Sequence, residues 1–173
     1  MLIDIKSLKL QLKTSEKFSL QEKLPDELLS DLEGCFVEPC QVELTVERNG
    51  NFYFGKGIVT TKLQLHCSRC LKEIFYPVNT ELNFSLVESI YENEFSQEET
   101  EIIFFHDTQV DITPIVQETV LLNLPIRMLC QENCQGLCSE CGVDKNLEEC
   151  KCQTKHIDPR WEKLKDLQTG KEV

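Results

Sequence analysis

Apolar and polar residues alternate along several stretches of the chain, which is the pattern of half-buried β-strands. Residues 8–12 alternate leucine with lysine and glutamine, and they predict a first strand. The same period of two returns at 42–46, 59–65 and 74–86. Asn49-Gly50 follows the second stretch, and this dipeptide adopts the positive φ values of a type I′ hairpin turn. The pattern therefore predicts antiparallel hairpins.

Two other stretches carry helical signals. Residues 25–32 begin with a proline and two acids and place leucines at helical spacing, so they predict a short helix. Asp111 and Pro114 supply a polar cap and a first-turn proline for a longer helix that continues to Leu124. Pro125 ends that helix, which we expect to cover the sheet.

The remaining stretches complete the predicted fold. Residues 88–101 are acidic and have no clear period, so they predict a surface loop, and 102–105 predict a strand after it. Residues 158–167 combine a capping aspartate, a proline and a narrow apolar stripe, which predicts a C-terminal helix. We therefore expect an α+β fold with an antiparallel β-rich sheet or partly closed barrel, a covering helix and a Cys-rich, zinc-ribbon-like C-terminal module.

The length of 173 residues allows one ordinary domain with an appendage. We expect an α+β domain over 1–126, a Cys-rich zinc module over 127–155 and a short helix over 156–173. No apolar run reaches membrane-spanning length, and the first residues lack the features of a signal peptide. These observations predict a cytoplasmic protein with no membrane contact.

The chain contains ten cysteines, which sort into pairs at 35/40, 67/70, 130/134, 138/141 and 150/152. The stretch 130–152 holds six of them and few large apolar residues, so something other than hydrophobic burial must order it, and the spacings favour a metal over disulfides. Cys138-x-x-Cys141-Gly142 has the form of a zinc knuckle, in which the glycine permits a positive φ. Cys67 and Cys70 lie between two alternating stretches, at the tip of a predicted hairpin. A redox pair would instead lie at a helix N-terminus.

These pairs predict two four-thiolate zinc sites. The first would join Cys67 and Cys70 to Cys130 and Cys134, and the second would combine Cys138, Cys141, Cys150 and Cys152. A single ion in the last cluster remains an alternative, because spacing alone cannot prove a long-range pair. The spacing of Cys134, Cys138 and Cys141 also matches an iron–sulfur motif of radical-SAM enzymes, but too few residues follow for their barrel. Cys35 and Cys40 are predicted to be structural.

Charge limits the possible partners. The chain has 18 basic and 30 acidic residues, and its net charge of −12 excludes bulk attraction to nucleic acid. Residues 56–77 differ, because this stretch contains four basic residues and a single acidic one. Lys56, Lys62, Arg69 and Lys72 are therefore the candidate contacts with RNA or a partner protein. We expect Arg69 to point outward from the knuckle as a phosphate contact, or else to donate hydrogen bonds around the thiolates.

The motifs of a catalytic site are missing from the sequence. Both predicted metal sites are all-sulfur sets with no ligand short, whereas catalytic zinc keeps an open position. No phosphate-binding glycine loop, nucleophile elbow or H-E-x-x-H motif is present. We therefore expect a protein without enzymatic activity.

Five motifs in order resemble the YceD family of large ribosomal RNA subunit accumulation proteins. They are Cys67-Ser68-Arg69-Cys70-Leu71, Leu124-Pro125-Ile126-Arg127-Met128-Leu129-Cys130, Cys134-Gln135-Gly136-Leu137-Cys138-Ser139-Glu140-Cys141-Gly142, Cys150-Lys151-Cys152 and Asp158-Pro159-Arg160-Trp161. The resemblance covers residues 40–167 and implies a non-enzymatic role in the accumulation of 23S ribosomal RNA during large-subunit biogenesis. Ser139 stands where many members have proline. Family members keep different numbers of the downstream cysteines, so metal binding is inferred from the residues of this chain.

Two partner classes fit this role, and a third function stays open. The first partner class is ribosomal RNA or a large-subunit assembly intermediate, bound through the basic hairpin around Arg69 and Lys72. The second is a basic ribosomal protein, for which the acidic chain would serve as an adaptor. A redox-sensing thiol protein without metal is the third reading. The sequence does not indicate an oligomeric state.

Overall fold

The computed structural model of the chain describes residues 1–94 and 102–152. Its strands are β1 (Leu2–Asp4), β2 (Ser15–Glu22), β3 (Cys35–Phe36), β4 (Cys40–Asn49), β5 (Phe52–His66), β6 (Glu73–Glu88), β7 (Ile102–Phe105) and β8 (Gln109–Asp111). Its α-helices are α1 (Lys6–Lys9) and α2 (Thr113–Leu122), and its 3₁₀ helices are η1 (Asp26–Leu32) and η2 (Ser89–Glu94). The mixed α+β class is therefore confirmed.

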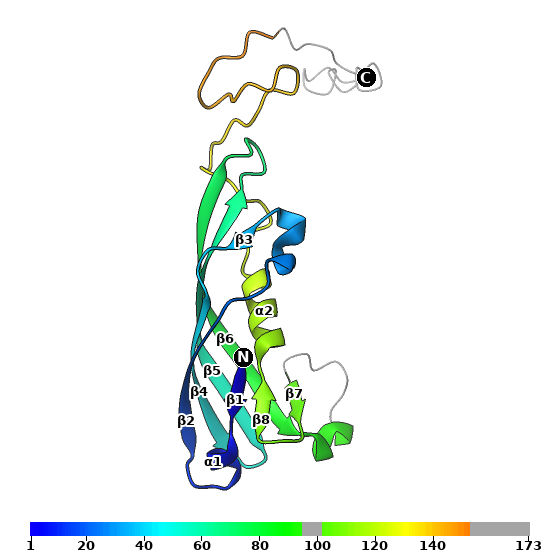
Figure 1. Cartoon of the computed structure of the whole chain (residues 1–173). Helices are drawn as coiled ribbons and strands as arrows, with labels where there is room; N and C mark the ends of the chain where they lie inside the picture. Colours follow the sequence, from blue (N-terminus) through cyan, green and yellow to red (C-terminus); the bar gives the residue numbers. More distant parts are fainter. Residues whose placement is uncertain (95–101, 153–173) are drawn as a thin grey trace, which may run out of the picture.

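Six strands form the main sheet, in the order β2-β4-β5-β6-β7, with β3 added alongside β5. Neighbouring strands are antiparallel except β6 and β7, which are parallel. β2 and β7 lie at opposite edges, so the sheet is open, and the alternative of a partly closed barrel is wrong. β1 and β8 form a separate two-stranded ribbon. This ribbon and α2 lie on the core side of the sheet (Figure 1).

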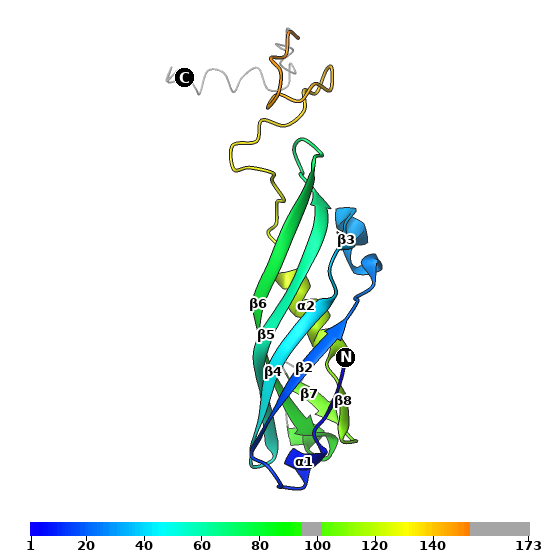
Figure 2. The same cartoon turned by 60° about the vertical axis from the view of Figure 1, so that its left-hand side comes forward.

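The hydrophobic core lies between the sheet and α2. Val116 and Val120 are one helical turn apart on α2, and both are buried. On β5 the side chains of Val59 and Leu63 are fully buried, whereas Thr60 between them is exposed. α2 therefore covers one face of the sheet, and the expected covering helix is confirmed. The opposite face has no covering element among the described residues, as Figure 2 shows with α2 behind the strands.

The β5–β6 hairpin is the longest part of the sheet and determines where the cysteines lie. Its two strands pair continuously from Phe52↔Val87 to His66↔Glu73. In Figure 1 the hairpin extends beyond β4 and β2, and its tip lies beside the chain that follows α2. The Cys-rich segment then lies past the tip, at one end of an elongated molecule.

The strand predicted at residues 8–12 is wrong. The segment begins in the short helix α1, and Gln11 takes a positive φ of 57° immediately after it. Leu8 is fully buried, whereas Leu10 and Leu12 are 59% and 73% exposed. The chain turns here from β1 into β2, so the segment does not extend as a strand. Three leucines at alternate positions are too short a pattern to distinguish the two cases.

The predicted hairpin turn after β4 forms one residue later than expected. Asn49 pairs with Phe52 at the ends of the two strands, so Gly50 and Asn51 are the turn residues, and Gly50 has a φ of 64°. Sequence analysis also missed β2, although Phe18 and Leu20 alternate there with polar residues. β2 pairs with β4 at the edge of the sheet. Its apolar pattern was too short to indicate a strand without that partner.

The other predicted elements lie close to their expected positions. η1, β7 and α2 fall within the stretches predicted for them, and the acidic region begins with η2. The C-terminal helix predicted at 158–167 lies outside the described residues. No helix in the described parts of the chain is long and apolar enough to cross a membrane.

Candidate metal centres

The strand alternation of β5 carries Cys67 to the buried side of the hairpin tip. Leu63 and Leu65 precede it at the same parity, and all three residues are fully buried. The tip closes because the Cys67 N–H donates to the Lys72 carbonyl and the Leu71 N–H donates to the Cys67 carbonyl, each at 2.9 Å. Leu71 adopts a left-handed φ of 61°, the conformation that Gly142 adopts at the equivalent position of the second knuckle. Cys67 and Cys70 therefore point to the same side of a tight turn.

The chain that follows α2 is joined to this tip through Met128. The N–H and Oγ–H of Ser68 both donate to the Met128 carbonyl, at 2.8 and 3.0 Å. Met128 is itself almost fully buried in the main core. This anchor places Cys130, two residues later, against the tip.

A second pair of bonds holds the next turn of the chain against the tip. The Arg69 guanidinium donates from Nη1 to the Cys134 carbonyl at 2.6 Å, and the Leu137 N–H donates to the Arg69 carbonyl at 3.0 Å. A side chain at Gly136, which has a φ of 72°, would place its Cβ 2.9 Å from the Arg69 carbonyl oxygen. Glycine is therefore required for this close approach.

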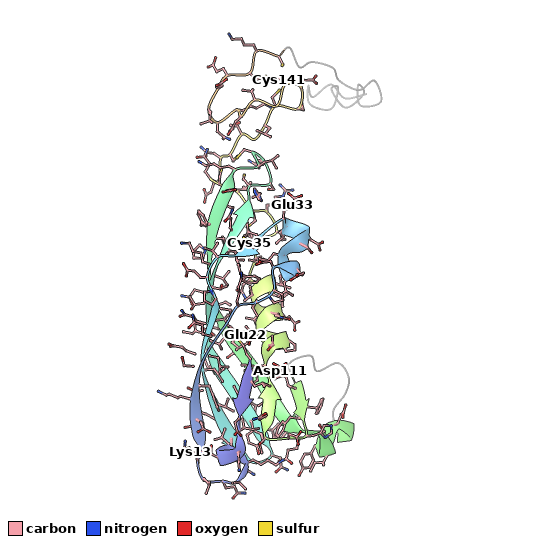
Figure 3. All side chains as sticks on the ribbon, viewed as in Figure 1. Lys13, Glu22, Glu33, Cys35, Asp111 and Cys141 are labelled. Atoms are coloured by element: carbon pink, nitrogen blue, oxygen red, sulfur yellow. The ribbon has the colours of Figure 1, made fainter. Side chains whose placement is uncertain are left out.

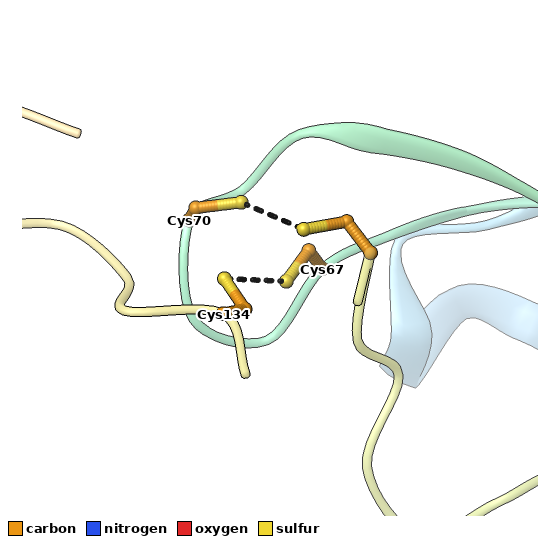
Figure 4. Close-up of side chains that lie close together, drawn as sticks. Cys67, Cys70 and Cys134 are labelled. Atoms are coloured by element: carbon orange, nitrogen blue, oxygen red, sulfur yellow. Dashed lines mark hydrogen bonds between the residues drawn. The ribbon is translucent and has the colours of Figure 1, made fainter. Parts of the chain in front are cut away.

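The four sulfurs of the first set meet at the tip (Figure 4). Cys67 Sγ lies 3.8 Å from Cys134 Sγ, and Cys70 Sγ lies 3.6 Å from Cys130 Sγ. All four sulfurs lie within 4.8 Å of one another. A tetrahedral zinc site with Zn–S bonds of about 2.3 Å needs S···S separations of about 3.8 Å, so the set fits such an ion. The separations are far too long for disulfides, and the cysteines are free.

The second set is built within one short loop. The Cys138 N–H donates to the Val143 carbonyl at 2.8 Å, and the Gly142 N–H donates to the Cys138 carbonyl at 2.9 Å. Cys150 Sγ lies 3.2 Å from Cys138 Sγ and 3.7 Å from Cys141 Sγ. The Cys152 sulfur completes the set within the same 4.8 Å limit.

The structure brings together the two four-cysteine sets that the spacing predicted. The first set is mostly buried, with Cys67 and Cys134 at 0% and 1% exposure. The second is more open, because Cys141 is exposed and lies on the outermost loop in Figure 3. Cys35 and Cys40 belong to neither set, and Cys40 is fully buried in the main core, as expected for a structural cysteine. Both sets could hold a metal ion.

One thiol in each set has a lowered pKa. Burial alone would raise the pKa of Cys67, but backbone N–H groups, led by that of Cys70, outweigh it and hold the pKa at about 6. The N–H groups of Cys141 and Glu140 lower the pKa of Cys138 to about 6. Each knuckle thus prepares a thiolate before any metal binds.

Other thiols of the same sets have raised pKa values. Burial, followed by neighbouring sulfurs led by that of Cys70, raises the pKa of Cys130 to about 12. Neighbouring sulfurs, led by that of Cys141, raise the pKa of Cys152 to about 12. Each set therefore retains at least one proton at neutral pH until a divalent cation displaces it.

Metal binding is expected to release protons at neutral pH and to weaken as the pH falls through about 6. At neutral pH, Cys130 and Cys152 must each lose a proton to bind. Below about pH 6, protons also occupy Cys67 and Cys138, so more protons compete with each ion. Calorimetric titration with zinc, in buffers of different ionisation enthalpy, measures this release. At least one proton per ion is expected, and an affinity that does not change with pH would contradict the account.

The four candidate basic contacts have different surroundings. Lys62 pairs with Glu38 at 3.7 Å and also lies over the ring of Phe75. Arg69 is exposed but does not simply point outward as a free phosphate contact, because its guanidinium is bonded to the chain at Cys134. Lys56 and Lys72 are exposed and form no ion pair with any residue that the structure describes. They are therefore the two side chains best placed to meet a partner.

Sequence reasoning missed Asn146. Its side chain comes from the loop between Cys141 and Cys150, yet its amide contacts the sulfur of Cys134 in the first set. The run Asp144-Lys145-Asn146 has the composition of an Asx turn, which signals a turn in the sequence. Nothing in that signal indicated a contact with the other set.

The fold and the two sets define a class of protein: an open α+β sheet whose longest hairpin ends in a cysteine cluster, followed by a second cluster in a short loop. The chain belongs to the YceD family, because the model of the family described as "Large ribosomal RNA subunit accumulation protein YceD" matches residues 55–168. That range contains all eight cysteines of the two sets. The resemblance inferred from the sequence is therefore confirmed.

Relatives are found in bacteria and a plant. An uncharacterised protein of Mycobacterium leprae is 28% identical over 152 residues, covering 86% of this chain and 70% of the relative. The uncharacterised protein YlbN of Bacillus subtilis is 29% identical, covering 63% of this chain and 62% of its own length. Large ribosomal RNA subunit accumulation protein YCED homolog 1, chloroplastic, of Arabidopsis thaliana is 24% identical, covering 75% and 48%. The chain thus spans between 48% and 70% of the length of these relatives. No solved structure matches it significantly.

Proposed function

We propose that this chain is a non-enzymatic factor in large ribosomal subunit biogenesis that supports the accumulation of 23S ribosomal RNA, with structural zinc in both cysteine sets. The observation that carries the proposal is membership of a family described by ribosomal RNA subunit accumulation, a description that the Arabidopsis relative shares. A cytoplasmic site of action agrees with this role, although the plant relative is named chloroplastic.

The ligand sets support structural rather than catalytic zinc. Each set supplies four sulfurs and no nitrogen or oxygen ligand, which is the donor chemistry of closed tetrahedral zinc sites. A catalytic zinc would need a position open to water or substrate. Zinc in the first set would join the hairpin tip to the chain that follows α2, so the metal would shape a surface rather than perform a reaction.

The open face of the sheet offers a surface for RNA. Phe54 is 44% exposed, and it lines a surface concavity together with Lys17, Lys56 and one acid, Glu47. Aromatic rings beside lysines bind single-stranded nucleic acid, because bases stack on the rings while the cations meet the phosphates. Lys72 is a second exposed lysine, at the hairpin tip. We infer that a segment of large-subunit RNA, or of an assembly intermediate, contacts this face.

The net charge favours a second candidate partner. At −12, the chain attracts a basic protein more readily than a polyanion. Glu43 and Glu47 also lie on the exposed side of β4, beside the lysines. An adaptor that holds a basic ribosomal protein during assembly would use these acids instead of Lys56 and Lys72.

Complementation tests the biological role. In a bacterium lacking its own YceD-family member, the chain is expected to restore the ratio of 23S to 16S ribosomal RNA. A matched Cys67→Ser variant should fail, whereas Cys35→Ser, which lies outside both sets, should succeed. Normal 23S levels in the deletion strain, or no rescue by the parent chain, would contradict the proposed function.

Charge reversal distinguishes the two partners. Lys56→Glu and Lys72→Glu are each expected to weaken binding to isolated large-subunit precursors several-fold and to reduce the log–log salt slope by about one unit. Lys6→Glu is the matched control, because Lys6 is exposed, lies in α1 at the end of the molecule opposite the hairpin tip, and does not line the concavity. Fluorescence anisotropy over a salt series measures both quantities. Binding that does not depend on either lysine, but is lost on Glu43→Lys, would favour the adaptor.

A further inference from the structure

Asn146 belongs to the loop of the second cysteine set, but its side chain lies against the first. Its Nδ2 donates to Cys134 Sγ at 3.4 Å. Its Oδ1 accepts the backbone N–H of Gln135 at 2.8 Å. One side chain of the outer loop thus holds both the sulfur of a first-set ligand and the backbone immediately after it.

The surrounding groups determine which way the Asn146 amide faces. Nδ2 also donates to Asp144 Oδ1 at 2.6 Å, and the same carboxylate accepts the Asn146 backbone N–H at 2.9 Å. Oδ1 faces two donors, the Gln135 N–H and Gln131 Nε2. A reversed amide would place its oxygen against the carboxylate and the sulfur, so only one orientation satisfies all the groups.

This N–H···S bond matters because four thiolates and one divalent ion leave a net charge of about −2 on the site. Donors to the sulfurs offset that charge and fix the positions of the ligands, which is why such contacts control metal affinity. Cys134 is 1% exposed, so water cannot readily replace the Asn146 amide. Asn146 is therefore a positioning residue for the first set.

The loop that delivers Asn146 is bonded to the short segment between the two sets. The Lys145 N–H donates to the Gly136 carbonyl at 2.9 Å, and Leu137 pairs with Asp144 in an isolated bridge. In the sequence, Cys138 and Cys141 come before this loop and Cys150 comes after it, so an ion in the second set would close the loop at both ends. Without a metal, the loop has few buried apolar side chains to keep it closed, and Leu147 within it is 82% exposed.

We propose that Asn146 couples the two metal sites, so that an ion in the second set strengthens binding of the ion in the first. As long as the second set holds its ion, the loop stays closed and Asn146 stays on Cys134. By thermodynamic reciprocity, an ion in the first set also strengthens binding at the second. This inference rests on the proposed metal sites and is independent of the ribosomal role.

The test measures zinc affinities of the full-length chain at equilibrium, by competition with a chromogenic chelator. Asn146→Ala removes the donor to the sulfur without placing a second carboxylate beside Asp144. It is expected to weaken the tighter site, which we assign to the buried first set, about ten-fold or more. Asn133→Ala is the matched control, one residue before Cys134, and should bind zinc with the parent affinities.

A second variant shows whether the effect passes between the sites. Cys141→Ser disables the second set, so the remaining site reports the first set, and its zinc affinity should be weakened by a similar factor. Adding Asn146→Ala to it should then change the affinity by no more than about two-fold. The coupling is wrong if Asn146→Ala leaves the affinity of the tighter site unchanged or if the two effects multiply. A chain that binds no metal would remove both the coupling and the proposed sites, but not the ribosomal role.

Discussion

Removal of metal with a chelator is expected to unfold residues 127–152 while the main sheet remains folded. The reason is the separation of two apolar clusters. The main core joins the sheet to α2, whereas Cys67, Cys70 and Cys134 form a separate small cluster with few large side chains. Structural zinc in such modules contributes on the order of 10 kcal/mol to folding, which the small cluster cannot replace.

Hydrogen exchange measures this outcome by residue. The amides of Leu137 and Cys138, which donate to the carbonyls of Arg69 in the hairpin tip and of Val143 in the module, should lose protection after chelation. The amides of β4 and β5 away from the tip should keep most of theirs, because the sheet and α2 still bury the same side chains. Unchanged exchange across 127–152 in metal-free protein would contradict this prediction. Returning zinc should restore the original pattern.

Cys67→Ser is expected to remove one ion and to detach the chain after α2 from the hairpin tip. Cys67 is fully buried, and a serine in its place would leave the first set with three thiolates instead of four. The Ser68 N–H donates to the Met128 carbonyl, so its hydrogen exchange shows directly whether the chain after α2 is still attached to the hairpin tip. Its exchange should accelerate by orders of magnitude, and the chain should lose about 3 kcal/mol or more of unfolding free energy.

The matched control is Cys35→Ser. Cys35 is half-buried in β3 and belongs to neither set, as its position in Figure 3 shows. This variant should keep both ions and the protection of Ser68. If Cys67→Ser also retained two ions, the first set would not be a metal site. Equal losses in both variants would indicate general destabilisation instead.

The cysteine sets could be predicted from the sequence because their geometry is local or follows a simple period. The alternation that ends at Leu65 places Cys67 at a buried position, and the C-x-x-C spacing forms a tight turn without help from the rest of the fold. The long-range pairing with Cys130 was a hypothesis from the number of thiols left over. The structure adds the physical link, which is the bond between Ser68 and the Met128 carbonyl.

Other features depend on tertiary contacts that no local pattern records. The burial of Leu8 in a helix rather than a strand follows from where the chain turns between β1 and β2. The parallel pairing of β7 with β6 depends on the path of the residues between them. Arg69 and Asn146 both donate hydrogen bonds to Cys134, which lies 65 and 12 residues away from them in the sequence. Such contacts are set by packing, so the sequence indicated only that polar residues were present.

Metal analysis of the purified chain, combined with X-ray absorption at the zinc edge, tests the central claim most directly. The account predicts two zinc ions per chain, each surrounded by four sulfurs at about 2.3 Å. Two ions with only sulfur ligands would establish that the hairpin tip and the outer loop are both metal sites. One ion per chain, no ion, or a shell containing nitrogen or oxygen would contradict the account.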